Sequence, residues 1–253
     1  MNVNIGCQTI TFGDAMHKDN IKAVFDSVAA AGYAGVEFGF FRIKDYPVNY
    51  LRELLDADSL MLAAVHVGGN ILDAASQREQ MDNIDLVIST VGKLGGKMVF
   101  VSGNSKDDFK EQAAKYNLLG ERVHDAGLLL CYHNHDWEIK DGFNGLNRIL
   151  DATKPEYLSL VMDVGWVKRG GADPIKAVNE YSSRLKHIHL KEFTSDGEFT
   201  ELGKGIVDFK GVYETLKGRS EDMWFIAEQD KSDIGAEKSV IENCAYMKKM
   251  LEG

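Results

Sequence analysis

The sequence is poor in cysteine and proline, with three of each among 253 residues. Cys7, Cys131 and Cys244 are odd in number and far apart, so they predict neither a disulfide framework nor a paired-cysteine metal site. The N-terminus, "MNVNIGCQTI", has no basic segment followed by an apolar one. Both observations favour a reducing, cytoplasmic setting.

The chain also lacks long apolar runs and an excess of basic residues. No run approaches the length of a membrane span, so we expect no membrane partner. The 39 acidic residues outnumber the 29 Lys and Arg, which gives a net charge of −10. Because surfaces that bind nucleic acid are usually basic, we do not expect nucleic acid as a partner either.

What the sequence does contain is a regular alternation of short apolar runs and longer amphipathic segments. The apolar runs predict eight strands, at residues 3–9, 35–40, 61–68, 97–103, 128–135, 158–165, 185–193 and 224–230. Helical spacing of apolar residues predicts helices between them, including 19–31, 76–94, 107–126, 172–181 and 236–251. The sequence therefore predicts strand–helix units that repeat along the whole chain.

Turn and capping residues agree with these boundaries. Gly32, Gly95 and Gly127 each follow a predicted helix and precede a strand, where a left-handed C-cap is needed. Ser76 and Glu79 have the spacing of a capping box, and Asp173–Pro174 is typical of a helix start.

Eight such units predict a (β/α)₈ TIM barrel, as a single domain over residues 1–253. Strands that are apolar throughout are typical of a parallel sheet buried on both faces. The competing fold, an open doubly wound sheet, commonly has a glycine-rich phosphate loop after its first strand. Here that position reads "CQTITFGDA", which is no such loop.

The active site of such a barrel lies at the carboxyl ends of its strands, and acidic and imidazole side chains gather there. Asp163 and Glu228 end apolar strands, where a buried charge must be paired or must bind a metal. With His189 and a glutamate from the fifth strand they form a mostly oxygen ligand set, which suits Mn²⁺, Mg²⁺ or Co²⁺ better than a structural zinc site.

This set predicts proton abstraction next to a carbonyl group. A bound cation would polarise a hydroxy-ketone and stabilise an ene-diolate. Glu138 and Glu228, on opposite walls of the barrel, are the predicted acid and base.

Other polar side chains at the same ends are candidates for binding the substrate. In the seventh strand, "LKHIHLKEF", His189 lies nearer the carboxyl end than His187, so we expect His187 one layer deeper as a supporting residue. Lys191 could neutralise an oxyanion, and Trp166 could stack on a substrate ring. Glu37 and His66 are candidates for binding substrate hydroxyls.

Six phrases of the sequence carry a family resemblance. In order they are "GYAGVEF", "LLLCYHNHDWE", "VMDVGWV", "HIHLKEF", "LGKGIVDF" and "FIAEQD". They resemble the xylose isomerase-like TIM-barrel superfamily, in particular its sugar phosphate isomerase/epimerase branch with inosose dehydratase and tagatose 3-epimerase-like enzymes. The resemblance implies one divalent ion (Mn, Mg, Co or Zn) held by Glu138, Asp163, His189 and Glu228, the first and last acting as the acid–base pair.

The fifth strand departs from the family pattern. Many members read "ENH" where this chain reads "HNH", so His133 occupies the position of a glutamate. Glu138, five residues on, resembles the glutamate of the tagatose-epimerase-like arrangement. The fifth-strand ligand is therefore open between Glu138 and the histidines His133 and His135, both of which are also candidates for the substrate pocket.

The sequence thus predicts a metal-dependent sugar isomerase or epimerase that acts on a polyhydroxy ketone or aldehyde. The alternative is a lyase or dehydratase acting on an inosose or a 3-keto-glycoside by β-elimination, which the histidines of "HNH" favour. The acidic net charge disfavours a metal-dependent endonuclease on the same fold. The two opposed glutamates disfavour a sugar-binding barrel without activity. A homo-oligomer is compatible with the sequence.

Overall fold

The computed structural model describes residues 1–16, 20–68, 77–105 and 108–252. Eight parallel strands close into a barrel in which β1 pairs with both β2 and β10, the last barrel strand along the chain. The strands are β1 (Val3–Gln8), β2 (Gly35–Gly39), β3 (Met61–Val67), β4 (Met98–Ser102), β5 (Leu129–His133), β6 (Ser159–Asp163), β7 (Leu185–Leu190) and β10 (Met223–Ala227). The predicted (β/α)₈ barrel is confirmed.

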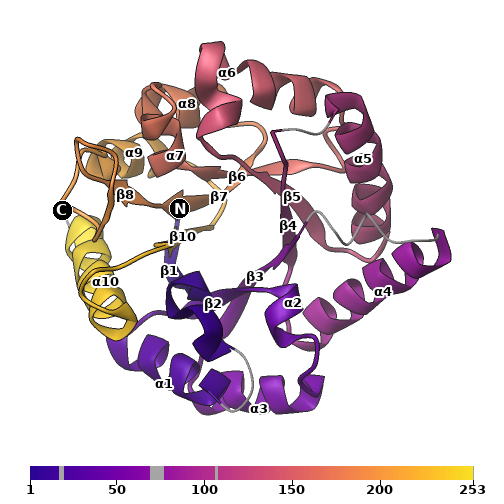
Figure 1. The fold of residues 1–253 in the computed structure, drawn as a ribbon, viewed down its shortest axis with the longest axis horizontal. Helices are drawn as coiled ribbons and strands as arrows, with labels where there is room; N and C mark the ends of the chain where they lie inside the picture. The colour runs from indigo at the N-terminus through magenta and orange to yellow at the C-terminus, as the bar shows by residue number, and fades with distance from the viewer. Residues whose placement is uncertain (17–19, 69–76, 106–107, 253) are drawn as a thin grey trace.

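Helices surround the barrel (Figure 1). They are η1 (Thr9–Met16), α1 (Ile21–Ala31), α2 (Phe40–Ile43), α3 (Val48–Ala57), α4 (Gln77–Lys93), α5 (Phe109–Asp125), α6 (Asp136–Asp151), α7 (Val164–Arg169), α8 (Pro174–Glu180), α9 (Phe209–Leu216) and α10 (Ala236–Glu252). None of the helices in the described ranges is both long and apolar enough to cross a membrane.

The predicted helix boundaries are largely confirmed. Gly32 ends α1 in the left-handed region at φ 92°, and Gly95 and Gly127 also have positive φ. The side chain of Asp173 accepts hydrogen bonds from the first backbone N–H groups of α8. Ser76, the predicted cap before α4, lies outside the described residues.

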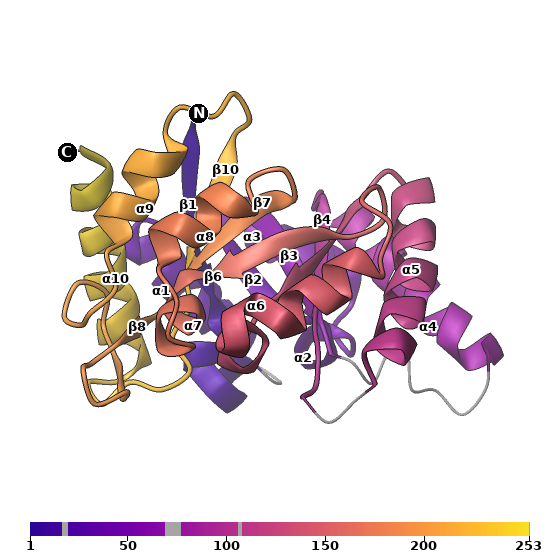
Figure 2. The same cartoon turned by 90° about the horizontal axis from the view of Figure 1, so that it is seen from above.

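The seventh predicted strand is divided in two. The barrel strand β7 ends at Leu190, and β8 (Glu192–Phe193) instead pairs antiparallel with β9 (Phe199–Thr200). Figure 2 shows β8, α2 and α7 at the end of the barrel opposite the N-terminus of the chain. This is the end where the strands finish, so these short elements surround the mouth of the barrel.

Apolar side chains fill both sides of the barrel wall. Inside the barrel a small buried cluster contains Ala64, Met98, Phe100, Cys131 and Val161. A much larger core lies between the strands and the surrounding helices. The barrel interior is therefore packed rather than open, which leaves the mouth as the place for chemistry.

Candidate active site

Four buried side chains from neighbouring strands converge at the mouth of the barrel. His133 ends β5, Asp163 ends β6, His189 lies in β7 and Glu228 directly follows β10. One ligand atom from each lies within 4.8 Å of the others. Sheet register brings them together, because Asp163 is paired with His189 and the backbone N–H of Glu228 donates to the carbonyl of Leu190. We call these four residues the metal group.

The contacts within the metal group join carboxylates to imidazoles. Oε2 of Glu228 lies 2.5 Å from Nδ1 of His189 and 3.2 Å from Nε2 of His133. Burial lowers the pKa of His189, but Glu37 and Glu228 outweigh it and raise the value to about 10. His189 therefore holds a proton next to the carboxylate of Glu228, at a place where a cation could replace that proton.

Asp163 provides the test of whether a metal fits. Its Oδ1 accepts a hydrogen bond from the backbone N–H of Trp166, whereas its buried Oδ2 has no hydrogen-bond donor within the described ranges. That oxygen faces Nε2 of His133 at 3.6 Å. The same oxygen lies 3.7 Å from Nζ of Lys191, so its neighbours are positive or polar, but none of those described is at hydrogen-bond distance. Since a buried carboxylate oxygen without a hydrogen bond is costly, two carboxylates and two imidazoles so arranged fit a divalent cation.

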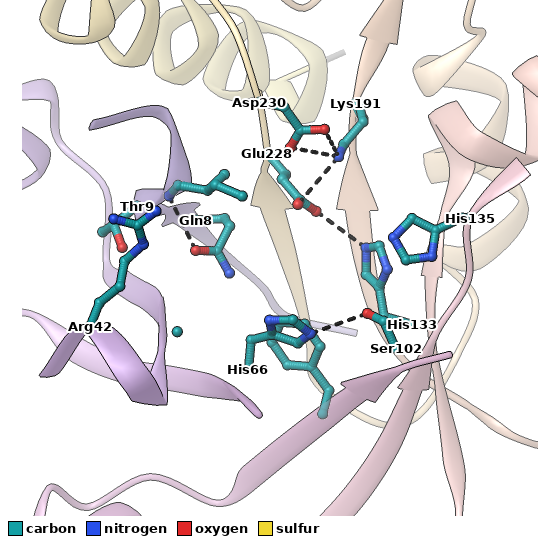
Figure 3. A pocket seen from close by; sticks show the side chains of 13 residues that line it. Gln8, Thr9, Arg42, His66, Ser102, His133, His135, Lys191, Glu228 and Asp230 are labelled. Carbon is teal, nitrogen blue, oxygen red and sulfur yellow. Dashed lines mark hydrogen bonds and ion pairs between the residues drawn. The ribbon is translucent and has the colours of Figure 1, made fainter. Parts of the chain in front are cut away.

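A cavity of about 220 Å³ opens onto the metal group. Glu228 and His133 line it, whereas the buried Asp163 and His189 are not among its lining residues. Figure 3 shows His66, Ser102, Gln8, Thr9 and Arg42 around the same space. The ring of Phe100 packs against the rings of His66, His133 and His189 and forms an apolar wall.

Lys191 places a buried positive charge beside the metal group. The residue is 1% exposed, and its Nζ lies 3.2 Å from Oε1 of Glu228 and 3.0 Å from both oxygens of Asp230 (Figure 3). Burial lowers its pKa, but Glu228, Asp163 and Asp230 outweigh that and raise it above the ordinary value. For the carboxyl group of Glu228, burial raises the pKa, but the positive charges of Lys191 and His189 outweigh burial and hold the pKa well below its usual range. Glu228 is therefore ionised.

The carboxylates that pair with Lys191 do not include that of its neighbour Glu192. Glu192 instead accepts hydrogen bonds from four backbone N–H groups, those of Phe193, Gly203, Ile206 and Val207. A Cβ at Gly205 would lie 2.5 Å from the carboxylate of Glu192, which explains the second glycine of "LGKGIVDF". Residues 203–207 thus surround the carboxylate of Glu192, and this holds in place the chain next to Lys191 at the rim of the cavity.

Glu138, which we expected to be a metal ligand, does not lie with Asp163, His189 and Glu228. It belongs to no metal-ligating group among the described residues. Its Oε1 accepts a 2.6 Å hydrogen bond from the hydroxyl of Tyr132, and its Oε2 accepts one from the backbone N–H of His135 at the start of α6. His133, the alternative fifth-strand ligand, lies in the metal group instead.

The expected substrate-binding residues fall into two sets. His66, His133, His135 and Lys191 line the cavity. Glu37 is completely buried beneath His187 and His189, and Trp166 packs against the side chains of Lys191 and His135 outside the cavity lining. The deeper position expected for His187 agrees with its contact to Glu37.

Sequence reasoning missed several residues of the cavity, namely Gln8, Thr9, Arg42, Phe100 and Ser102. Gln8 and Ser102 end β1 and β4, so the rule that found Asp163 would have found them too. Arg42 lies in the short helix α2 and donates a hydrogen bond to the carbonyl of Gly13. Nothing in the local sequence marks Arg42 as facing this cavity.

Comparison with known proteins agrees with this architecture. The xylose isomerase-like TIM barrel family matches residues 25–250. An inosose dehydratase from Clostridium beijerinckii is 24% identical over 90% of this chain and 88% of its own length. A sugar phosphate isomerase/epimerase from Parabacteroides distasonis superposes with a TM-score of 0.78 at 19% identity, over 97% of this chain and 93% of that one. The IOLI protein, whose crystal structure has a bound zinc atom, superposes with a TM-score of 0.76 at 15% identity, over 98% of both chains.

The chain belongs to the xylose isomerase-like TIM barrel family. This confirms the family resemblance predicted from the six sequence phrases. The relatives are named for isomerase, epimerase and dehydratase activities, which are the activities that the sequence predicts for this chain.

Proposed function

We propose that this protein is a divalent-metal-dependent enzyme that removes a proton next to the carbonyl group of a polyhydroxy ketone or aldehyde. One observation carries the proposal: Glu228 and His133 belong to a buried metal-ligating group and also line the adjoining cavity. A base and a cation site thus adjoin one small polar space. Returning the proton to a different atom or face makes the enzyme an isomerase or epimerase.

His133, Asp163, His189 and Glu228 would hold the ion. With two imidazoles instead of one, the set favours Zn²⁺, Co²⁺ or Mn²⁺ over Mg²⁺, which prefers oxygen ligands. The zinc in the related IOLI structure agrees with this choice. When bound, the ion supplies positive charge beside the substrate carbonyl and so makes the neighbouring C–H bond more acidic.

Glu228 takes the proton. Its carboxylate is ionised and lines the cavity, as a base must. Lys191, bound to both Glu228 and Asp230, fixes the direction of that carboxylate and offers positive charge to a developing oxyanion. Phe100 gives the cavity an apolar wall beside these residues.

A second candidate reaction is β-elimination by a dehydratase or lyase. The observation that favours it is that Glu138 is not in the metal group. Both of its oxygens accept hydrogen bonds elsewhere, from the hydroxyl of Tyr132 and from the backbone N–H of His135. One carboxylate base and the cavity-lining imidazole of His135 then remain, a pair suited to removing a proton and protonating a leaving hydroxyl group. The inosose dehydratases among the relatives support this candidate.

The test is exchange in D₂O. Zinc- and cobalt-loaded protein is incubated with ketoses, inososes and 3-keto-glycosides, and the products are followed by NMR. Deuterium at the carbon next to the carbonyl supports proton abstraction, a new epimer identifies the isomerase reaction, and a new alkene identifies the dehydratase. Absence of exchange with every substrate would contradict the proposal.

Glu228→Gln tests the base. We expect it to abolish deuterium exchange, and the metal content of the variant is measured in parallel because Glu228 is also a proposed ligand. The matched control is Asp230→Asn, which neutralises the neighbouring carboxylate on Lys191 and should keep measurable exchange. Full exchange in Glu228→Gln would contradict the role of Glu228.

The cytoplasmic location, the single domain over residues 1–253 and the homo-oligomer stay predictions. A sugar or sugar derivative is the substrate class that we propose.

A further inference from the structure

Beneath the metal group, one fully buried carboxylate contacts two histidines. Oε1 of Glu37 lies 2.6 Å from Nε2 of His187, and its Oε2 lies 2.9 Å from Nε2 of His189. All three side chains have no solvent exposure. Oε2 of Glu37 also accepts a 3.4 Å hydrogen bond from the side-chain amide of Gln8, which lines the cavity. Glu37 therefore contacts the inner side of His189, opposite the metal group.

The two nitrogens of His189 thus face two different carboxylates. Nδ1 faces Glu228 in the metal group, and Nε2 faces Glu37 below it. A neutral imidazole carries one N–H, and only the nitrogen without the proton can bind a cation. Placing the proton on Nδ1 would turn the Nε2 lone pair toward the carboxylate of Glu37, which is repulsive in a buried site.

We propose that Glu37 is a positioning residue that fixes the tautomer of His189, with the proton on Nε2 and Nδ1 free to bind the cation. His187 contacts the other oxygen of Glu37 and keeps its carboxylate in place. A carboxylate next to the second nitrogen of a metal-binding histidine can orient the ring and make it a stronger ligand. The inference rests on the metal site of the proposed function, and it gives Glu37 a role other than binding sugar hydroxyls.

The rival interpretation is a separate cation among Glu37, His187 and His189, whose ligand atoms also lie within 4.8 Å of one another. Several of these atoms, including Nε2 of both histidines, lack an aligned hydrogen-bond partner within the described ranges. However, Glu37, His187 and His189 do not line the described cavity next to the metal group. A cation there would have three protein ligands, and one of them, His189, also belongs to the metal group. The positioning role needs no second cation, because Glu37 already lies at ion-pair distance from both histidines.

The decisive measurement is the tautomer of His189 in zinc-loaded wild-type protein. Long-range ¹⁵N–¹H NMR on histidine-labelled protein distinguishes a protonated Nε2 from a metal-bound one, and His189→Gln assigns the signal. We expect zinc on Nδ1 and the proton on Nε2. Zinc on Nε2 would overturn the proposal in favour of the rival site.

Variants of Glu37 test the cause. Glu37→Leu removes both acceptor oxygens, and Glu37→Gln keeps one, so we expect zinc affinity to fall by about 10–100-fold in the first and less in the second. The matched control is Glu201→Gln, a buried carboxylate that accepts from Gln229 and Ser232 and should leave affinity unchanged. Affinity is measured by competition with a chelator, and the tautomer by the same NMR experiment in Glu37→Gln.

The outcomes separate this inference from the proposed function. If the wild-type protein binds no divalent ion, the proposed function and the inference both fail. If the wild type binds zinc through Nδ1 of His189 and both Glu37 variants keep its affinity and tautomer, only the inference fails. The inference is supported if zinc affinity is lowered in Glu37→Leu, lowered less in Glu37→Gln and unchanged in Glu201→Gln.

Discussion

The hydroxyl of Tyr132 donates a 2.6 Å hydrogen bond to Oε1 of Glu138, and this contact directs the glutamate into the wall of the barrel. The other oxygen, Oε2, accepts from the backbone of His135 at the start of α6. Both oxygens of the expected fifth-strand ligand thus have partners. His133 points from the end of the same strand toward Glu228 and Asp163. Where this chain has His133 in place of the family's glutamate, both oxygens of Glu138 accept hydrogen bonds within the protein.

Metal affinity should consequently depend on His133 and not on Glu138. We expect His133→Gln to lower zinc affinity by tenfold or more, about 1.4 kcal/mol of binding free energy. Glu138→Gln, which removes the charge but can still accept from Tyr132, should bind zinc as the wild type does. Competition titration with a chelator measures both, and loss of binding in Glu138→Gln would restore Glu138 as the ligand.

Lys191 should matter most when no metal is bound, because its charge then faces three carboxylates. We expect Lys191→Met to lower the free energy of unfolding by about 3–5 kcal/mol in EDTA, since it leaves buried carboxylates uncompensated. Adding Asp230→Asn should recover part of that loss, as contacting residues are coupled.

Lys186→Met is the control for that experiment. Lys186 lies on the same strand and pairs with Glu221 near the surface, so its loss should cost less than about 1 kcal/mol. Urea denaturation measures all four proteins. Equal losses in the two lysine variants would contradict a special role for the buried ammonium.

His66 should make the folded state less stable in acid. Burial, followed by the nearby His133, lowers the pKa of His66 to about 4 from an ordinary 6.5. Between these values the unfolded chain binds a proton that the folded protein does not, so stability falls as the pH is lowered through this window. His66→Asn removes this contribution, up to about 1.4 kcal/mol per pH unit.

The measurement is the free energy of unfolding of the wild type and of His66→Asn, in EDTA, at several pH values from 7.5 to 4. The wild-type curve should fall more steeply below pH 6.5, and the two curves should run parallel above it. Parallel curves throughout the range would show that His66 titrates normally in the folded protein.

Glu192 should hold the rim of the cavity without taking part in metal binding. Glu192→Ala removes one acceptor from four backbone N–H groups, of which that of Ile206 still donates to the carbonyl of Phe193. We therefore expect a loss of about 2 kcal/mol or more and faster proteolysis between residues 194 and 206. The exposed Glu198 lies on the same loop, and Glu198→Ala should stay within about 0.5 kcal/mol of the wild type. Zinc affinity should persist in both variants, and its loss in Glu192→Ala would show that the rim contributes to the site.

Much of the fold follows from local pattern. Eight apolar runs, the helical spacing between them and residues such as Gly32 and Asp173 gave boundaries that the structure matches within a few residues. The division after Leu190 was not predictable, because Glu192–Phe193 continues the alternation of β7. Its pairing with Phe199–Thr200 depends on how the chain turns back beyond it.

The candidate site was predictable to the level of strand ends. Asp163, His189 and Glu228 stand out because each is a polar group in an apolar run, and a parallel barrel brings all strand ends to one rim. The choice between His133 and Glu138 was left open, and the place of Glu37 beneath His189, outside the cavity lining, was not foreseen. Strand spacing places a side chain on a face, but it does not say which partner that side chain meets across the barrel.

The sequence by itself determined the barrel, the end of it that carries the chemistry and most of the charged groups there, since these depend on periodicity and on residue type. The tertiary structure decided the partners. Lys191 binds Asp230 and Glu228, and Glu37 lies under His189, because strands far apart in sequence meet in one register. Such contacts form only when the barrel closes, so no local pattern encodes them.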